Sequence, residues 1–232
     1  MFFSSPMKKN KVSVVAVCLN EAGSILRILE NIPKKVVDEI LVVDGHSTDR
    51  TFELVKNAGY KIILQEGKGR GRAFRTGFKK VKGDFVIMLS TDGNERPADI
   101  KKLIDKANEG YDMVIATRFG LGRSEDVTFI RNFGNHFFTL LCNIVSGLRI
   151  TDSMNGFRIL SKDAIKKMNL EADKFDIEGE VTIKAGKLKL KVGEIPTIED
   201  ERQHSISRLR TIKDGSIILR RIFKEAFRKP PY

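Results

Sequence analysis

The sequence predicts an α/β fold in which helices flank a mostly parallel β-sheet. Val12–Cys18 is a continuous, largely β-branched apolar run, as expected of a strand that is buried on both faces. Similar short runs recur up to residue 116, and segments with helical spacing separate them. This alternation is typical of parallel strands joined by right-handed helical crossovers. The 232 residues, 41% of them hydrophobic, suffice for one large domain with a buried core.

The elements of the first half follow in turn. Asn20 and Glu21 end the first strand, the polar segment 44–49 closes the second, and glycines at 67, 69 and 71 mark a loop before a helix. Pro97 is suited to the first turn of a helix. Strands are expected at residues 12–18, 39–43, 61–64, 84–89 and 112–116. Helices are expected at residues 24–31, 48–58, 73–81 and 97–108.

The second half has a different character. A helix is expected at residues 129–145, with one apolar face made of Phe133, Phe137, Phe138, Leu141, Ile144 and Val145. A loop at 152–158, a helix at 175–185 and a short edge strand at 192–196 follow. The chain ends in a basic loop at 202–209 and a basic amphipathic helix at 211–228. We therefore divide it into a domain, residues 1–210, and a basic amphipathic tail, residues 211–232.

The charge balance favours an anionic partner. A net charge of +12 suits nucleic acid, a membrane surface or a phosphorylated substrate, and a solvated Lys-rich surface is the alternative. Two Cys and three scattered His argue against a disulfide scaffold and a zinc site. No apolar run is long enough to span a bilayer, and the first residues do not resemble a secretory signal. We expect an intracellular protein with Cys18 and Cys142 as free thiols.

Acidic and amide side chains follow the second and fourth expected strands. The carboxyl ends of parallel strands share one edge of the sheet, where ligands bind. Asp44, Asp49, Asp92 and Asn94 would therefore lie along one rim. Asp and Asn are also common in turns and helix caps, and capping fits Asp49 better. For Asp44 and Asp92 we favour a functional role.

Four motifs occur in order along the chain. They are Leu19-Asn20-Glu21, the segment 43–49, Gly69-Arg70-Gly71-Arg72-Ala73 with Gly77-Phe78, and Ser90-Thr91-Asp92-Gly93-Asn94 with Pro97. In this order and spacing they resemble glycosyltransferase family 2, which has the Rossmann-like GT-A fold, and most closely its dolichol-phosphate mannose synthase branch. The resemblance extends from Val12 to about Ile218.

The chain departs from the family pattern most informatively after the fourth strand. In the family's D-x-D-x-Q motif, Asp92 aligns with the second, metal-binding Asp. Ser90 replaces the first Asp and Asn94 replaces the Gln. The alignment thus leaves the metal site one carboxylate short, and Glu95 is a candidate contributor.

Later motifs extend the resemblance. Thr117-Arg118-Phe119 resembles S-R-Y, and Arg131 aligns with a basic residue that opens the amphipathic helices. Asp152 with Gly156-Phe157 resembles D-x-x-x-G-F. Phe175 with Glu180 matches F-x-I-x-x-E, which favours Glu180 over Glu178. Arg202 and Ser207-Arg208-Leu209 resemble the R-x-x-G-x-S-K-L loop without its Gly.

The resemblance assigns donor-site roles. Residues that would contact or approach the nucleotide-sugar donor are Asn20, Glu21, Asp44, Gly69, Gly71, Ser90 and Asp92. For the glycines, the alternative is a mobile surface loop. Asp92 and Asn94 offer hard oxygen ligands, which suit Mg²⁺ or Mn²⁺.

The acceptor decides the other roles. A lipid phosphate, with a second pKa near ~6, is largely dianionic at neutral pH, so it needs cations rather than a base. Arg118, Arg131 and Arg202 are the candidates, and each is equally compatible with a surface charge. A sugar hydroxyl would instead need a carboxylate base, and Asp152 or Glu180 would supply it.

The resemblance implies a metal-dependent, inverting glycosyltransferase that moves a hexose, mannose from GDP-mannose, to a polyprenyl or dolichyl phosphate at the membrane surface. Alternatives are a UDP-sugar-dependent member with a glycan or other acceptor, a degenerate transferase that only binds nucleotide, and a nucleic-acid-binding protein. The rim acids and the lack of a nucleic-acid motif argue against the last. We expect a cytoplasmic protein held peripherally at an anionic membrane by residues 129–145 and the basic tail. Packing of both segments on the domain is the competing interpretation.

Overall fold

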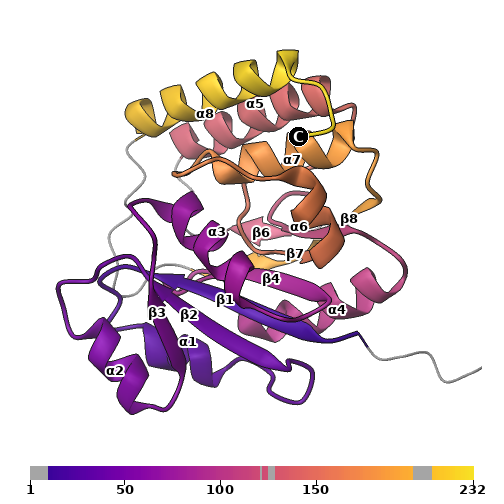
Figure 1. Cartoon of the computed structure of the whole chain (residues 1–232). Helices are drawn as coiled ribbons and strands as arrows, with labels where there is room; N and C mark the ends of the chain where they lie inside the picture. Colours follow the sequence, from indigo (N-terminus) through magenta and orange to yellow (C-terminus); the bar gives the residue numbers. More distant parts are fainter. Residues whose placement is uncertain (1–9, 121, 125–128, 201–210) are drawn as a thin grey trace, which may run out of the picture.

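The computed structural model describes residues 10–120, 122–124, 129–200 and 211–232. Its centre is a seven-stranded sheet with the order β3-β2-β1-β4-β7-β5-β8 (Figure 1). The strands are β1 (Val12–Cys18), β2 (Glu39–Asp44), β3 (Lys61–Leu64), β4 (Phe85–Ser90), β5 (Met113–Thr117), β7 (Arg158–Ser161) and β8 (Val192–Pro196). A second, two-stranded sheet pairs β6 (Arg123–Ser124) with β9 (Ile198–Glu199).

The main sheet is parallel except at β7. β1 pairs in parallel with β2 and β4, whereas β7 runs antiparallel between β4 and β5. The six predicted strands are confirmed to within about a residue at each end, and β8 does lie at the edge. β7 was not predicted, because its four residues carry no periodicity that separates them from the preceding loop. Only the pairing with β4 and β5 makes this segment a strand.

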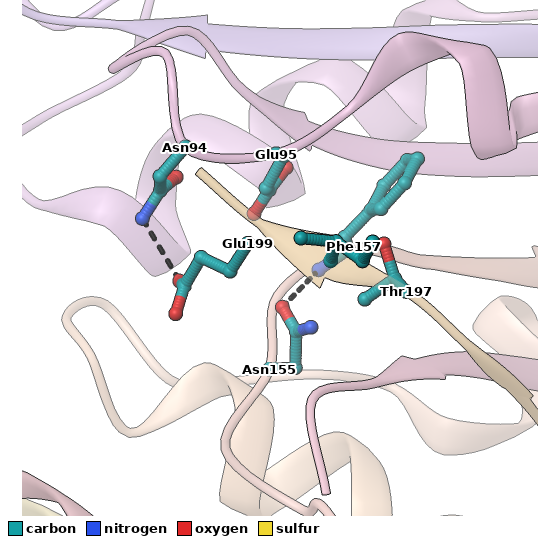
Figure 2. Close-up of a pocket in the computed structure, with 7 residues that line it drawn as sticks. Asn94, Glu95, Asn155, Phe157, Thr197 and Glu199 are labelled. Atoms are coloured by element: carbon teal, nitrogen blue, oxygen red, sulfur yellow. Dashed lines mark hydrogen bonds between the residues drawn. The ribbon is translucent and has the colours of Figure 1, made fainter. Parts of the chain in front are cut away.

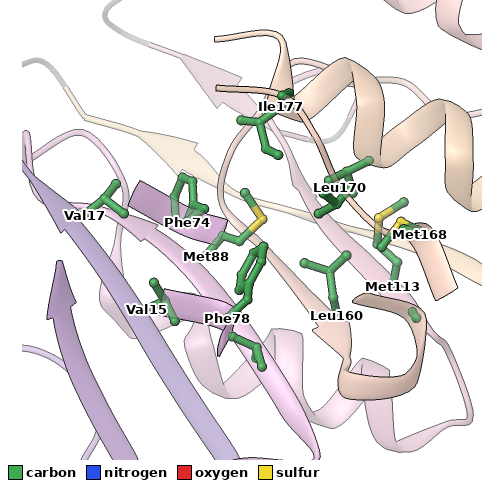
Figure 3. Packing of buried hydrophobic residues seen from close by; sticks show 14 of the residues in the cluster. Val15, Val17, Phe74, Phe78, Met88, Met113, Leu160, Met168, Leu170 and Ile177 are labelled. Atoms are coloured by element: carbon green, nitrogen blue, oxygen red, sulfur yellow. The ribbon is translucent and has the colours of Figure 1, made fainter. Parts of the chain in front are cut away.

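Helices cover both faces of the sheet. On one face lie α1 (Ile25–Glu30), α2 (Thr51–Asn57) and α4 (Ile100–Asn108, preceded by a 3-10 turn at Pro97–Asp99). On the other lie α3 (Arg70–Lys80), α6 (Lys162–Met168) and α7 (Ile177–Lys187). Val14 and Ala16 of β1 belong to the first core and Val15 and Val17 to the second, so both faces of β1 are buried. Figure 3 shows the second core, where Phe74 and Phe78 of α3 meet Met88 of β4.

Two further helices form a third layer against α7. These are α5 (Phe129–Ser146) and α8 (Thr211–Phe227), which lie side by side above α7 in Figure 1. Cys142 of α5, Ile183 of α7, and Ile218 and Ile222 of α8 make a small core of their own. The tail that follows residue 210 is therefore packed on the preceding domain through one face of α8.

The sequence predicted one apolar face on α5, but the apolar residues of this helix lie on two sides. Phe138, Leu141 and Val145 pack against the core around Cys142. Phe133, Phe137, Leu140 and Ile144 are exposed, as are Phe223 and Phe227 of α8. The packing interpretation thus holds for one side of each helix and leaves the other side uncovered. No helix in the described part of the chain is both long and apolar enough to cross a membrane.

The basic face expected for α8 is largely paired with carboxylates. Arg221 Nε lies 2.9 Å from an oxygen of Asp176. Lys224 and Arg228 lie 2.7 and 2.8 Å from Glu171. The basic tail that we expected to face an anionic membrane therefore has these three charges paired within the protein. They instead attach α8 to the segment before α7.

Glu171 is expected to make the stability of this attachment depend on pH. Its hydrogen bonds from Arg228 and Lys224 lower the pKa of Glu171 from 4.5 to about 2. Because the folded-state pKa is the lower one, the stabilisation is complete above pH 4.5 and is lost as the pH falls toward 2. Glu171→Gln should cost about 1 kcal/mol at pH 7, since its side chain is 35% exposed and screened.

Urea unfolding between pH 7 and pH 3 measures this effect. The difference between wild type and Glu171→Gln should shrink as the pH falls. Glu53→Gln, which changes an exposed carboxylate of α2, is the control. A difference that stays constant over this range would contradict the pairing.

Candidate active site

The loops after β1 and β2 are tied together at the carboxyl ends of the strands. Asn20 has a left-handed backbone (φ 50°), and its side-chain oxygen accepts a hydrogen bond from the Thr48 amide at 2.7 Å. The Glu21 amide donates to the Thr51 hydroxyl at 2.8 Å, and the Glu21 carboxylate accepts from Ser24 at 3.2 Å. Asn20 and Glu21 thus lie at the predicted rim.

Asp44 lies at the end of β2 but is completely buried. One carboxylate oxygen accepts the Ser47 amide at 2.7 Å, and the other lies 3.6 Å from the Cys18 thiol. Asp44 therefore orders the turn after β2, a structural role that its position after a strand did not indicate. Asp49 accepts from the amides of Thr51 and Ala22, so it orders the turn before α2, although the N-cap residue of that helix is Arg50.

Gly69 and Gly71 allow a close approach of two backbone segments. Gly69 has φ 109°, and a Cβ at either position would collide with a carbonyl oxygen of residues 172–173. The amides of Gly71 and Arg72 donate to the carbonyls of Lys174 and Asp173, at 3.2 and 3.1 Å. The first turn of α3 is thus anchored by protein carbonyls, so a phosphate cradle made of these amides is not what the glycines provide.

Arg70, between the two glycines, reaches the end of β4. Its Nε lies 2.8 Å from Glu178 of α7, and its Nη1 donates to the Ser90 hydroxyl. Its Nη2 lies 3.9 Å from Glu95, which accepts the Ser90 amide at 2.6 Å. Arg70, Ser90, Glu95 and Glu178 therefore form one cluster, which we call the Arg70 cluster.

Electrostatics link this cluster to Asp92. Burial has the largest effect on Glu95 and raises its pKa. The positive charge of Arg70 opposes this effect and the negative charge of Asp92 adds to it, so the pKa of Glu95 rises to about 7. Burial lowers the pKa of Arg70, but Glu178, Glu95 and Asp92 outweigh it and raise the value. The end of β4 thus gathers three carboxylates around one guanidinium.

The donor set suits a divalent cation that is shared with a ligand. Asp92 supplies a partly buried carboxylate at the end of β4, while the Asn94 amide nitrogen donates to Glu199 at 2.9 Å. Within the described ranges, no three His, Cys, Asp or Glu side chains are grouped as a metal cage. Mg²⁺ commonly binds one or two carboxylates together with substrate phosphates. The residues present fit that mode, with Asp92 as the protein ligand.

Arg118 and Asp152 neutralise one another. The guanidinium makes two hydrogen bonds to the carboxylate, at 2.8 and 3.0 Å, and the side chains are 10% and 0% exposed. Arg118 also lies 3.4 Å from Glu199, which holds Asn94 (Figure 2). Burial would raise the pKa of Asp152, but the charge and hydrogen bonds of Arg118 lower it. This network joins the loops after β4, β5 and α5.

Glu180 does not lie with these residues. It is completely buried, pairs with Lys184 at 2.7 Å, and accepts the amides of Glu171 and Ala172. It therefore shapes the segment whose carbonyls anchor α3. Glu178 lies two residues earlier on α7 and points in a different direction. It is the carboxylate that contacts Arg70 and so reaches the rim.

Two predicted site residues have side chains outside the described part of the structure. Arg202 lies outside the described residues, and for Arg131 only the backbone at the start of α5 is described. The sequence did not single out Glu199, which no motif marks. Arg70 had a signal, since it stands inside the glycine motif, but the motif itself specifies only the glycines around it.

Similarity to known proteins agrees with this geometry. Residues 13–168 match the model of glycosyl transferase family 2. The glycosyltransferase AglJ of Haloferax volcanii is 32% identical over 218 residues, covering 91% of this chain and 72% of that protein. The dolichol-phosphate mannosyltransferase of Pyrococcus furiosus is 30% identical, covering 86% and 59%. The UDP-N-acetylglucosamine–dolichyl-phosphate N-acetylglucosaminyltransferase of Methanococcus voltae is 26% identical, covering 93% and 96%.

The fold is shared with a solved structure. Glucosyl-3-phosphoglycerate synthase from Mycobacterium tuberculosis, crystallised with Mn²⁺, UDP-glucose and phosphoglyceric acid, superposes with a TM-score of 0.77. It is 18% identical, and the match covers 95% of this chain and 81% of that one. The predicted GT-A architecture is thereby confirmed. The family match and the identity to AglJ together show that this chain is a glycosyltransferase of family 2.

Proposed function

We propose that the protein transfers a hexose, mannose from GDP-mannose, onto a polyprenyl phosphate at a membrane surface. The observation that carries this is α5, which is partly exposed beside the candidate site and carries no charge after Arg131. Residues 132–148 contain no Asp, Glu, Lys or Arg. The ring of His136 on α5 packs edge-on against Phe119, with 4.4 Å between centroids, and Phe119 follows Arg118. An apolar surface next to the site suits an acceptor whose chain stays in a bilayer.

The chemistry needs little from a base. An oxygen of the lipid phosphate attacks the anomeric carbon, and the bond to the nucleoside diphosphate breaks with its electrons leaving on that group. In-line attack inverts the anomeric centre. A bound Mg²⁺ or Mn²⁺ would offset charge on the leaving diphosphate, and Asp92 is the residue that would hold it. Asn20 and Glu21 would hold the nucleoside end.

The acceptor phosphate requires cations that are not already neutralised. Arg118 is committed to Asp152, so it supports the site by shaping the loop after β5. Arg131 and Arg202 are the proposed phosphate ligands, because guanidinium binds phosphate in a bidentate manner. In our proposal Glu178, and not Glu180, is the carboxylate of α7 that belongs to the site, because it contacts Arg70 at the end of β4.

A UDP-sugar donor is the second candidate. The relative from Methanococcus voltae, named for UDP-N-acetylglucosamine, matches over 96% of its own length. Transfer assays with GDP-mannose, UDP-glucose and UDP-N-acetylglucosamine, each with a polyprenyl phosphate and a water-soluble glycan, test both candidates. Product with GDP-mannose and lipid is the expected result. Equal rates with soluble acceptors would exclude the lipid specificity.

We also propose peripheral attachment to the cytoplasmic face of the membrane through α5 and α8. Phe133, Leu140, Ile144 and Phe227 are 58–85% exposed, which would make them the inserting side chains. A variant with Phe133, Leu140 and Ile144 changed to Ser should sediment with anionic vesicles at least tenfold less, because each apolar side chain contributes about 1.5 kcal/mol or more on burial.

Leu64→Ser supplies the matched control. Leu64 is 52% exposed but lies on β3, at the other edge of the main sheet from β8. It should leave sedimentation unchanged. If the triple variant sediments as the wild type does, attachment through α5 is excluded, and size-exclusion chromatography of both proteins would show whether α5 instead joins two copies.

A further inference from the structure

The guanidinium of Arg70 is held in one orientation at the end of β4. It bonds Glu178 on one side and Ser90 on the other, and it lies 5.0 Å over the ring of Phe74. A Cβ at position 156 would collide with its Nη2, so Gly156 leaves the space that the guanidinium occupies. The anchored first turn of α3 fixes the backbone from which it projects. A cation placed in this way loses little entropy when it binds a ligand.

Arg70 retains donors for a ligand. An arginine has five N–H groups. Among the residues that the structure describes, the hydrogen bonds of Arg70 to Glu178 and Ser90 use two of them. Glu95 lies 3.9 Å away, beyond hydrogen-bond distance. The side chain is 17% exposed, so Arg70 is not fully closed off from solvent at the end of β4.

Ser90 adds no further negative charge beside Arg70, which is already paired with Glu178. A hydroxyl accepts the hydrogen bond of Arg70 without adding a negative charge, whereas an Asp at the same position would form a bidentate ion pair with it. Arg158 adds a second, completely buried guanidinium beside Glu178, where it is held by the carbonyls of Ser153 and Asn155. The backbone carbonyl of Glu178 accepts a hydrogen bond from Arg158 at 3.5 Å, so two guanidinium groups lie near this residue.

We infer that Arg70 binds the diphosphate of the nucleotide donor and that its fixed charge supports nucleotide binding without a divalent cation. This rests on the proposed function, which supplies a nucleoside diphosphate at the end of β4. Ser90, in place of a carboxylate, would then weaken metal binding, and the positive charge of Arg70 would offset this loss at the diphosphate. Asp92 and Arg70 would act on the same diphosphate from the same rim.

Calorimetry with GDP and UDP tests the inference, with full-length protein in Mg²⁺ and in EDTA. Wild type should bind one of the two nucleotides in both conditions. In EDTA, Arg70→Gln should weaken that binding about 10- to 100-fold, the range for charge-assisted hydrogen bonds. Arg70→Lys, which keeps the charge but not the fork, should lie between them. Arg72→Gln removes a charge from the same turn, where Arg72 pairs with Asp173, and should change affinity less than twofold.

Ser90→Asp provides a second test that does not remove the guanidinium. By capturing Arg70 it should weaken binding in EDTA and increase the gain from Mg²⁺. This variant decides the question if thermal unfolding shows that Arg70→Gln is not folded. Wild type that binds in Mg²⁺ but not in EDTA, or an Arg70→Gln protein that binds as wild type does in EDTA, would overturn the inference and leave the proposed function standing. Absence of binding in both conditions would overturn both.

Discussion

Asp92→Asn should lower the rate of sugar transfer at least about 100-fold, the loss typical when one preorganised electrostatic contact to developing charge is removed. Asp92 is the carboxylate at the end of β4 that fits a shared divalent cation. The variant keeps the size and hydrogen-bonding capacity of the side chain, so its unfolding temperature should stay within a few degrees of wild type. Initial rates at saturating Mg²⁺, together with calorimetric nucleotide affinity, measure the effect.

Asp105→Asn is the matched control for this experiment. Asp105 is exposed on α4 and pairs with Lys101, four residues earlier. Its replacement removes the same charge away from the rim and should leave the rate unchanged. An Asp92→Asn enzyme that keeps a third or more of the wild-type rate would exclude Asp92 from the donor site.

Asp152→Asn should destabilise the protein by about 3–5 kcal/mol, because breaking one partner of a buried ion pair leaves the other charge uncompensated. The Asp152 carboxylate is completely buried and receives two hydrogen bonds from the Arg118 guanidinium. Arg118→Met should cost a similar amount. In the double variant the two losses should be far from additive, since neither charge then remains buried alone.

Urea unfolding of the four proteins measures this coupling. The same variants separate two roles for Arg118, which the sequence suggested as a ligand of the acceptor phosphate. Loss of stability with an unchanged KM for polyprenyl phosphate supports the structural role. Unchanged stability with a raised KM would show that Arg118 binds the acceptor.

Local sequence patterns were sufficient for most of the fold. The apolar runs of β1, β2 and β4 are long enough to be recognised without knowledge of their neighbours, and their alternation with helices implies the parallel sheet. The polar residues after those strands therefore lie at one rim, as Asn20, Glu21 and Asp92 do. β7 escaped detection because four residues become a strand only when β4 and β5 supply its hydrogen bonds.

The roles of individual side chains depended on partners far away in the sequence. Glu178 and Glu180 are two residues apart on α7, yet Glu178 meets Arg70 while Glu180 turns to the segment before α7. A motif identifies that a carboxylate is needed there, but not which of the two reaches the rim. The same holds for Asp44, whose burial follows from the packing of the turn after β2 and not from its position after a strand.

The sequence by itself thus determined the parallel strands, the helices between them and the rim at which their polar residues lie, because strand and helix periodicity are local properties. Tertiary structure alone decided which charges are free. Arg118, Arg221, Lys224 and Arg228 are basic residues in the sequence, but each is paired with a carboxylate in the fold. It also decided which apolar residues of α5 are covered, because only one side of that helix meets α7 and α8. The physical reason is the same in both cases: the charge and the apolar surface that a residue presents depend on contacts between segments distant in sequence.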